Sequence, residues 1–168
     1  MKLVLLTLII LVALFATIFF ILAYLSKSGV APGLANGQLA KCPDSPNCVC
    51  SEYPNDSSHY VTPLILLPDN SQEQYSIIKA VIADMGGYIE HEEDNYLAAS
   101  FSSAIFGFVD DIEIRLDPVK RTIHMRSASR VGRSDAGVNA KRLQLLTNTY
   151  NSRMSGLNVP DEKSTDDE

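Results

Sequence analysis

The feature that most constrains this chain is an uninterrupted apolar run at its N-terminus, from Leu3 to Leu25. Only Thr7, Thr17 and Tyr24 within it are even mildly polar. Crossing the hydrocarbon core of a bilayer takes about 20 helical residues, whereas the apolar core of a signal peptide takes about 7–15. The sequence therefore predicts a transmembrane anchor over residues 1–25. The folded domain must be built from the rest of the chain.

Two other interpretations of this run stay open. A cleaved signal peptide would place small residues soon after the apolar stretch, and the candidates around Ala23 and Ala31 fit that requirement poorly. A lipoprotein would need a small residue just before the acylated cysteine, but Cys42 follows a lysine and lies far from the run. Membrane orientation is weakly encoded, because Lys2 and the free amine face only Lys27 on the other flank.

The three cysteines, Cys42, Cys48 and Cys50, lie close together near the start of the remaining chain. The segment between Cys42 and Cys48 contains prolines and Asn47, which favour turns, so a disulfide between these two cysteines is sterically reasonable. A disulfide needs an oxidising compartment, which predicts a domain in the periplasm or outside the cell. Reduced thiols are the alternative, and zinc is disfavoured because no second pair of Cys or His ligands accompanies them. Cys50 is then the odd thiol, either free or competing for the bridge.

Shifts in composition define the limits of the folded domain. Residues 26–41 are rich in Gly, Ala and Ser, which predicts a short flexible linker. Residues 160–168 are acidic and have almost no apolar side chains, which predicts a disordered tail. We therefore expect the folded domain over residues 42–159, a length sufficient to bury a core.

The first half of this domain predicts one strand and one helix. Residues 60–67 are strand-like, although Pro63 would restrict the strand to an edge or split it. A helix is predicted from Gln72 to Met85, with Ser71 and Gln74 at the spacing of a capping box. The two glycines that follow should end this helix.

Beyond those glycines the hydrophobic period changes from helical to alternating. The alternating segments predict four antiparallel strands, at residues 88–91, 96–102, 109–117 and 122–130. In the third of them, aliphatic side chains alternate with Asp111, Glu113 and Arg115, as in a sheet with one dry face and one wet face. Arg126 and Arg130 take outward positions on the last strand.

A final helix over residues 136–154, capped by Ser134 or Asp135, completes the domain. The order of elements is then strand, helix, four strands, helix. This order predicts a two-layer α+β fold with both helices on one face of an antiparallel sheet. By analogy it resembles the TBP-like and helix-grip architectures, in which a curved sheet and a long terminal helix often enclose an apolar cavity.

Charged residues fall into two blocks along the chain. From Asp84 to Glu113 there are acids but no Lys or Arg, whereas from Arg115 to Arg142 the bases dominate. Cross-strand ion pairs, such as Glu113 with Arg126, account for this arrangement and contribute about 0.2–1 kcal/mol each. The other interpretation is an anion-binding surface formed by the basic block.

The richest chemistry lies in residues 126–142, where a predicted strand turns through glycines into the final helix. The candidate anion ligands are Arg126, Arg130, Arg133, Asn139 and Arg142. Guanidinium groups can grip a carboxylate or phosphate with two bonds, and a helix N-terminus offers free N–H groups. The structural alternative is that Asp135 caps the helix and pairs with Arg130 or Arg133, while Asn139 bonds nearby backbone.

Motifs for catalysis, metals and cofactors are missing from the sequence. There is no nucleophile elbow, P-loop or dinucleotide fingerprint, and His59, His91 and His124 lack metal-ligand spacing. We therefore predict no metal and no cofactor. Nucleic acid is disfavoured as a partner by the net charge of −6, by the predicted compartment and by the lack of aromatic residues among the basic ones.

Three motifs give the chain a family resemblance. They are Cys42-Pro-Asp-Ser-Pro-Asn-Cys48-Val, Phe108-Val-Asp-Asp-Ile-Glu and the whole of residues 126–142. Over most of the expected domain the chain resembles the DUF1499 family of uncharacterised proteins, although the family tends to have serine where this sequence has Cys50. The resemblance implies no established activity. It implies one shared surface or scaffold formed by Cys42, Cys48, Asp110, Arg126, Arg130, Gly132, Asp135, Gly137 and Asn139.

Together these observations favour a membrane-tethered, non-enzymatic binding module for a lipid or another amphiphilic anion. A protein-interaction module of the cell envelope, docking through the polar sheet face, is the close alternative. An enzyme using Cys50 or the region of Asp110 comes third. An apolar cavity between sheet and helices would favour the first function, and a filled core with an exposed apolar patch would favour the second.

Overall fold

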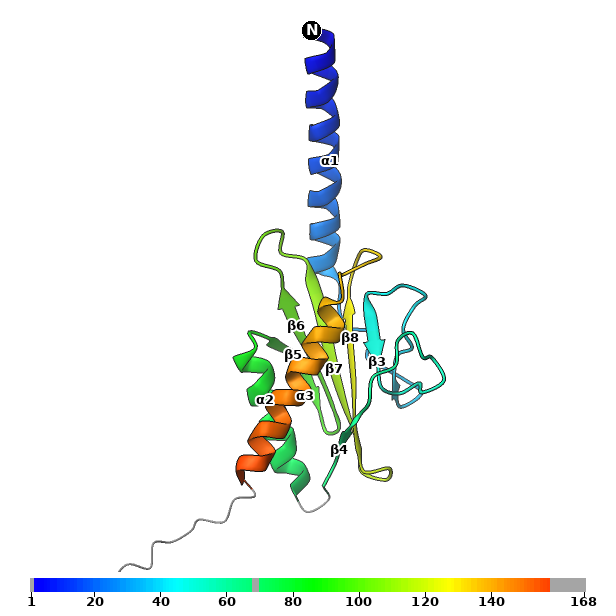
Figure 1. Ribbon diagram of the computed structural model, residues 1–168, viewed down its shortest axis with the longest axis vertical. Helices are drawn as coiled ribbons and strands as arrows, with labels where there is room; N and C mark the ends of the chain where they lie inside the picture. The colour runs from blue at the N-terminus through cyan, green and yellow to red at the C-terminus, as the bar shows by residue number, and fades with distance from the viewer. Residues whose placement is uncertain (1, 68–69, 158–168) are drawn as a thin grey trace, which may run out of the picture.

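The computed structural model describes residues 2–67 and 70–157, so the tail predicted at 160–168 lies outside the described residues. It shows an N-terminal apolar helix, α1 (Lys2–Ser28), that projects from one end of an α+β domain (Figure 1). By length and composition α1 can cross a membrane, and none of its apolar window is buried against the domain. The domain itself is an antiparallel six-stranded sheet packed with two helices.

The sheet is formed by β3 (Cys48–Cys50), β4 (Leu64–Ile65), β5 (Tyr88–Glu93), β6 (Tyr96–Ser102), β7 (Val109–Asp117) and β8 (Thr122–Ser129). Strands β5 to β8 lie side by side in chain order, as the alternating segments predicted. Both β3 and β4 pair with the outer edge of β8, and β4 is short because it begins directly after Pro63. A separate hairpin is made by β1 (Leu34–Ala35) and β2 (Gln38–Leu39).

Helices α2 (Ser71–Asp84) and α3 (Val138–Leu157) cover one face of the sheet (Figure 1). Side chains with no exposure to solvent come from both layers, and they include Ile78, Ile82, Leu97, Ile112, Ile114, Ile123 and Leu146. Each such side chain contributes about 1.5–3 kcal/mol through burial. These residues fill the space in which a helix-grip fold would hold its apolar cavity.

The start of α2 corrects one prediction. Its N-cap is Asn70, no side chain caps it, and Ser71 is already helical. Gln74 accepts a hydrogen bond from the Leu67 N–H at 2.6 Å, and it donates to the Ile65 carbonyl and to the Tyr150 hydroxyl. The predicted capping box is therefore wrong. The buried side chain of Gln74 instead bonds to the β4 segment and to Tyr150 of α3. The predicted end of the helix is confirmed by Gly86, whose φ of +85° is left-handed.

The polar face of the sheet is covered as well, which corrects the expectation of a wet face. Asp111, Glu113 and Arg115 of β7 are buried beneath the chain that runs from α1 to β3. Part of that chain was predicted to be a linker, yet Leu39 is fully buried and the Gly33 N–H donates to Glu113 at 3.0 Å. Alternation in β7 thus places aliphatic side chains in the apolar core beneath the helices and charged side chains in a second buried layer. We call this second layer, which contains Asp111, Glu113 and Arg115, the ionic layer.

Candidate functional site

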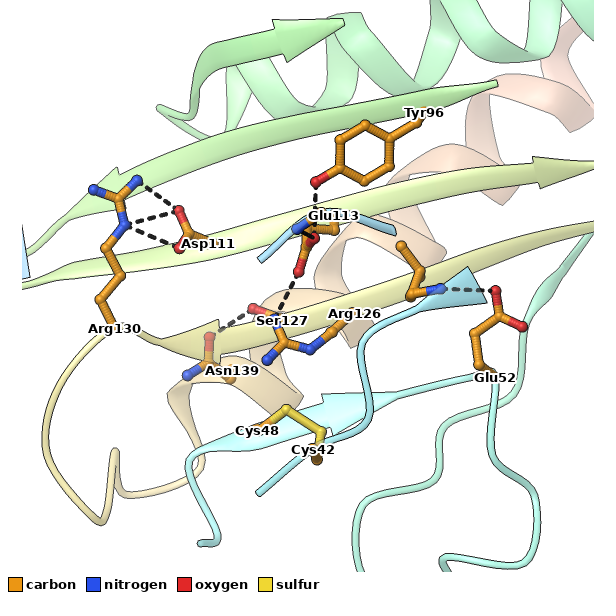
Figure 2. A network of polar contacts seen from close by, with 12 residues as sticks. Cys42, Cys48, Glu52, Tyr96, Asp111, Glu113, Arg126, Ser127, Arg130 and Asn139 are labelled. Atoms are coloured by element: carbon orange, nitrogen blue, oxygen red, sulfur yellow. Dashed lines mark hydrogen bonds and ion pairs between the residues drawn. A yellow bond between two sulfur atoms is a disulfide. The ribbon is translucent and has the colours of Figure 1, made fainter. Parts of the chain in front are cut away.

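The centre of the ionic layer is Glu113, whose carboxylate is fully buried (Figure 2). Arg126 donates to it from Nη1 at 2.6 Å, and the Tyr96 hydroxyl donates to it at 2.8 Å. Burial and the neighbouring Glu113 charge raise the pKa of Tyr96 well above its usual range, so the hydroxyl stays protonated and keeps donating. This cluster fastens β6, β7 and β8 together and supports the segment at Gly33.

A second buried group surrounds Arg115. Its Nε donates to Glu52 at 2.5 Å, and its Nη2 donates to Asp117 at 3.2 Å. Glu52 also accepts the Leu39 N–H at 3.3 Å, so the ion pair holds the β2 hairpin on the sheet. His124 lies 3.7 Å from Glu52, and burial lowers the pKa of its ring, which is therefore neutral at pH 7.

The disulfide joins Cys42 to Cys48, as their spacing predicted, and lies against the same face of the sheet (Figure 2). The third cysteine, Cys50, is buried opposite Arg126 in the β3–β8 pair. Burial raises the pKa of the Cys50 thiol to about 11, so the reactive thiolate hardly forms at neutral pH. Cys50 is therefore a buried thiol that stays protonated at neutral pH.

The predicted arginine ligands have different environments. Arg130 makes a two-pronged contact with Asp111, with bonds of 2.7–3.0 Å, and Arg126 is held by Glu113. Arg142 donates to Asp110 at 2.8 Å. Arg133, in contrast, is exposed and makes no ion pair within the described part of the chain. Carboxylates of the domain thus neutralise Arg126, Arg130 and Arg142, and Arg133 presents its charge to the surface.

The turn that carries Arg133 is rigidly built. Asp135 accepts the N–H groups of Gly137 and Asn139 at 3.0 and 2.7 Å, which caps the start of α3. Burial acts to raise the pKa of Asp135, but these backbone hydrogen bonds lower it overall. Gly132 and Gly137 have φ of +88° and +76°, conformations that favour glycine. An anion would find these helix N–H groups already occupied by Asp135.

The side chain of Asn139 is buried and hydrogen-bonded within the domain. Its amide donates to the Asn47 carbonyl and to Ser129 Oγ, both at 3.0 Å, and it accepts from Ser127 at 2.6 Å. Asn47 in turn donates to the Gly132 carbonyl at 2.9 Å. The disulfide loop, the end of β8 and α3 are therefore joined through one amide, and this amide is not free to contact a ligand.

The last turns of α1 dock on the domain. Ser26 is fully buried, and its hydroxyl accepts the Val109 N–H at 2.8 Å and donates to the Val109 carbonyl at 3.3 Å. Nearer the N-terminus, the ring of Phe19 lies 5.3 Å from Phe106 and 6.0 Å from Phe108, between ring centroids. Two loops surround α1 at this end of the domain, residues 103–108 after β6 and residues 130–137 after β8 (Figure 1).

A groove of about 580 Å³ lies where α1, these two loops and α3 meet. Its apolar lining is Phe19, Leu22, Phe106, Phe108, Val109, Val131 and Val138. Its polar lining includes the Asp110–Arg142 ion pair, Asp135 and four serines, Ser102, Ser103, Ser129 and Ser134. Of the predicted residues, the groove brings together Asp110, Gly132, Asp135 and Arg142, whereas Arg126 and Asn139 belong to the interior.

Sequence reasoning missed the apolar wall of this groove. Phe19 and Leu22 were indistinguishable from the other residues of an apolar helix, since no pattern in the run indicates that it packs against the domain. The available signal was the Phe106-Gly-Phe108 motif, because two aromatic residues between predicted strands are unusual in a loop that faces water.

Comparison with known families finds one match. The model of a family described as "Protein of unknown function (DUF1499)" matches residues 38–149, which include the ionic layer, the disulfide and both loops of the groove. Neither the curated proteins nor the solved structures contain a match. The apolar helix and the disulfide together indicate a domain outside the cytoplasm.

Proposed function

This chain belongs to the DUF1499 family, and we propose that it is a membrane-anchored binding module for an anionic membrane lipid, held in the groove between α1 and the domain. The observation that carries the proposal is the composition of the groove. Phe19 and Leu22 on one side of the groove belong to α1, the helix that would cross the bilayer. The groove also contains the Asp110–Arg142 ion pair. Such a combination matches a molecule with an acyl chain and a charged head.

Our proposal locates this groove at the membrane surface, from the helical rise of α1. At about 1.5 Å per residue, the segment from Leu3 to Leu22 would span the roughly 30 Å of the hydrocarbon core. Leu22 then lies at the boundary between acyl chains and headgroups, and Phe19 lies about 4–5 Å inside it. A bilayer lipid could enter the groove sideways without leaving the membrane.

Exposed cations favour an anionic headgroup. Arg133 and Lys141 are exposed on the turn and first turn of α3, beside the groove. Neither makes an ion pair within the described residues, so their charges remain available. Each Lys or Arg near an anionic surface contributes about 1 kcal/mol of attraction. Half-buried Arg142 would add a donor in the groove, although Asp110 and Asn139 already accept from it.

A protein-interaction module is the second candidate. The filled space between sheet and helices favours it, as does the exposure of Phe106 in the groove and of its neighbour Ile105. A helix of a membrane partner would then occupy the site that we assign to lipid. The two candidates differ in what remains bound after purification.

The test is native mass spectrometry of the full chain released from nanodiscs that contain phosphatidylcholine and phosphatidylglycerol. We expect retained phospholipid, enriched in phosphatidylglycerol. The Ser102→Phe variant should lose the adduct, because Ser102 is exposed and lines the groove. Ser152→Phe, on an exposed position of α3 outside the groove, is the matched control and should retain it. Arg133→Ala with Lys141→Ala should reduce the preference for phosphatidylglycerol.

Bare protein from these nanodiscs would overturn the lipid proposal, and so would equal retention by Ser102→Phe and the wild type. Circular dichroism spectra that match the wild type establish that each variant is folded. Cross-linking of the groove to one specific membrane protein, in the absence of retained lipid, would support the interaction module.

A further inference from the structure

We infer that the β6–β7 loop, residues 103–108, is a second membrane contact that inserts Ile105 and Phe106 into the bilayer beside α1. This inference rests on the proposed membrane anchor but not on the ligand of the groove. Its partner is the acyl-chain boundary of the membrane leaflet into which α1 enters.

The side chains of this loop suit a lipid environment. Ile105 is 84% exposed and Phe106 is 55% exposed, although both are large and apolar. No charged residue occurs from Tyr96 to Val109, so the loop carries none. Loops that face water ordinarily carry polar residues, and adjacent exposed apolar side chains beside an apolar helix indicate a membrane surface.

The position of the loop along α1 gives its depth. Ser26 marks the docking point at Val109, and Phe19 lies seven residues earlier, or about 10 Å along the helix axis. Because the Phe106 ring lies 5.3 Å from that of Phe19, the loop reaches back along α1 toward the membrane. With Leu22 at the hydrocarbon boundary, Phe106 lies at or just inside the acyl chains.

Hydrogen bonds within the loop join its two ends. Ser103 N–H donates to the Phe108 carbonyl at 2.8 Å, and the Phe108 N–H donates to Ser103 Oγ at 3.0 Å. The Gly107 N–H donates to the Ser103 carbonyl at 3.0 Å, so the loop closes on itself. Lysine commonly extends along apolar surface to keep its amine at the headgroups, and Lys27 lies against Gly107.

Gly107 is the residue that permits this arrangement. Its φ of +67° is left-handed, and a Cβ there would come within 2.7 Å of Cε of Lys27. A side chain at this position would therefore strain the turn and displace the lysine. Ile105 is left exposed in this turn, while the rings of Phe106 and Phe108 both lie near Phe19 of α1.

The test uses tryptophan fluorescence, because the chain has no tryptophan. The full chain carrying Phe106→Trp is reconstituted into liposomes, and lipids brominated at successive acyl positions serve as quenchers. We expect emission blue-shifted from that of a residue in water, with quenching strongest for bromine near the headgroup end of the chain. Ile105→Trp provides an independent second reporter in the same loop.

Two matched variants calibrate the measurement. Val119→Trp reports from a position that is 94% exposed in the β7–β8 turn, at the end of the domain opposite α1 (Figure 1), and should escape quenching by bromolipid. Phe19→Trp reports from the anchor itself and should be quenched. Iodide in the aqueous phase should give the reverse order, with Val119→Trp quenched most.

Each outcome decides the inference. Quenching of the Phe106→Trp and Ile105→Trp variants by bromolipid supports it. If Phe19→Trp is quenched while both loop reporters respond only to iodide, the loop lies in water, and the inference is overturned while the groove proposal stands. If the chain fails to float with liposomes, the anchor is overturned, and the loop inference with it.

Discussion

The buried carboxylate of Glu113 lies 2.6 Å from Nη1 of Arg126, directly across the β7–β8 pair. Glu113 has further donors in Tyr96 and Gly33, whereas Nε of Arg126 has no hydrogen-bond partner among the described residues. Glu113 therefore joins several parts of the ionic layer, whereas the charge of Arg126 is balanced by Glu113. A surface arginine could bond to water instead, whereas Arg126 is only 6% exposed.

Glu113→Ala should accordingly destabilise the fold by about 3–5 kcal/mol, since it leaves the Arg126 charge buried and unpaired. Lys79→Ala is the control, because it removes an exposed ion pair with Glu92 that is worth about 0–1 kcal/mol. Urea unfolding of the full chain in detergent micelles, followed by circular dichroism, measures both. Similar losses of unfolding free energy in the two variants would show that the buried Glu113–Arg126 pair contributes no more to stability than an exposed pair.

The start of α2 gives a second contrast between neighbouring residues. Gln74→Ala should cost about 1–3 kcal/mol, because the Leu67 N–H, the Ile65 carbonyl and the Tyr150 hydroxyl all lose a buried partner. Ser71→Ala should change the free energy of unfolding by less than about 0.5 kcal/mol, as surface substitutions do. The same unfolding experiment distinguishes the two variants. A larger loss of stability in Ser71→Ala than in Gln74→Ala would show that Ser71 caps the helix after all.

Much of this fold could be predicted because local patterns determine local structure. The strands at 96–102 and 109–117 were placed residue for residue, since strict alternation has no helical counterpart. What could not be predicted was the cover on the polar face. An outward Glu113 has the same sequence pattern whether water or the Gly33 segment lies above it. That distinction depends on contacts between residues far apart in the chain.

The candidate site shows the same limit. The predicted anion ligands were chosen by residue type. Residue type does not reveal that Arg130 is already paired with Asp111, or Arg142 with Asp110. The pairing of Glu113 with Arg126 was predictable, because strand register follows from alternation. The groove was not, because it exists only where α1 meets the loops of the domain.

Titration should limit stability on both sides of neutral pH. Burial lowers the pKa of His124, so the unfolded chain takes up a proton first as pH falls below about 6.5, and stability drops there. Burial raises the pKa of Cys50 to about 11 and that of Tyr75 to about 12, so the unfolded chain loses protons first above about pH 9. We expect a stability plateau between those limits.

Unfolding midpoints across pH 5–11 check this expectation. His124→Gln should flatten the acid limb, and Cys50→Ser should reduce the alkaline limb. In the native chain Cys50 should also resist alkylation at pH 7 and react with a single label after unfolding, since Cys42 and Cys48 are joined. Rapid native labelling would contradict the buried thiol.

The junction between α1 and the domain depends on one hydroxyl, because Ser26 both donates to and accepts from the backbone of Val109. Ser26→Ala should leave the Val109 N–H without its partner and loosen the last turns of α1. The Val109 amide should then exchange with deuterium faster, measured by mass spectrometry of the full chain in nanodiscs. Ser28→Ala removes only a hydroxyl bonded within the helix to the Leu25 carbonyl, and it should leave Val109 exchange unchanged. If both variants exchange like the wild type, the hydroxyl does not hold the junction, and packing of Phe19 on the loop must do so alone.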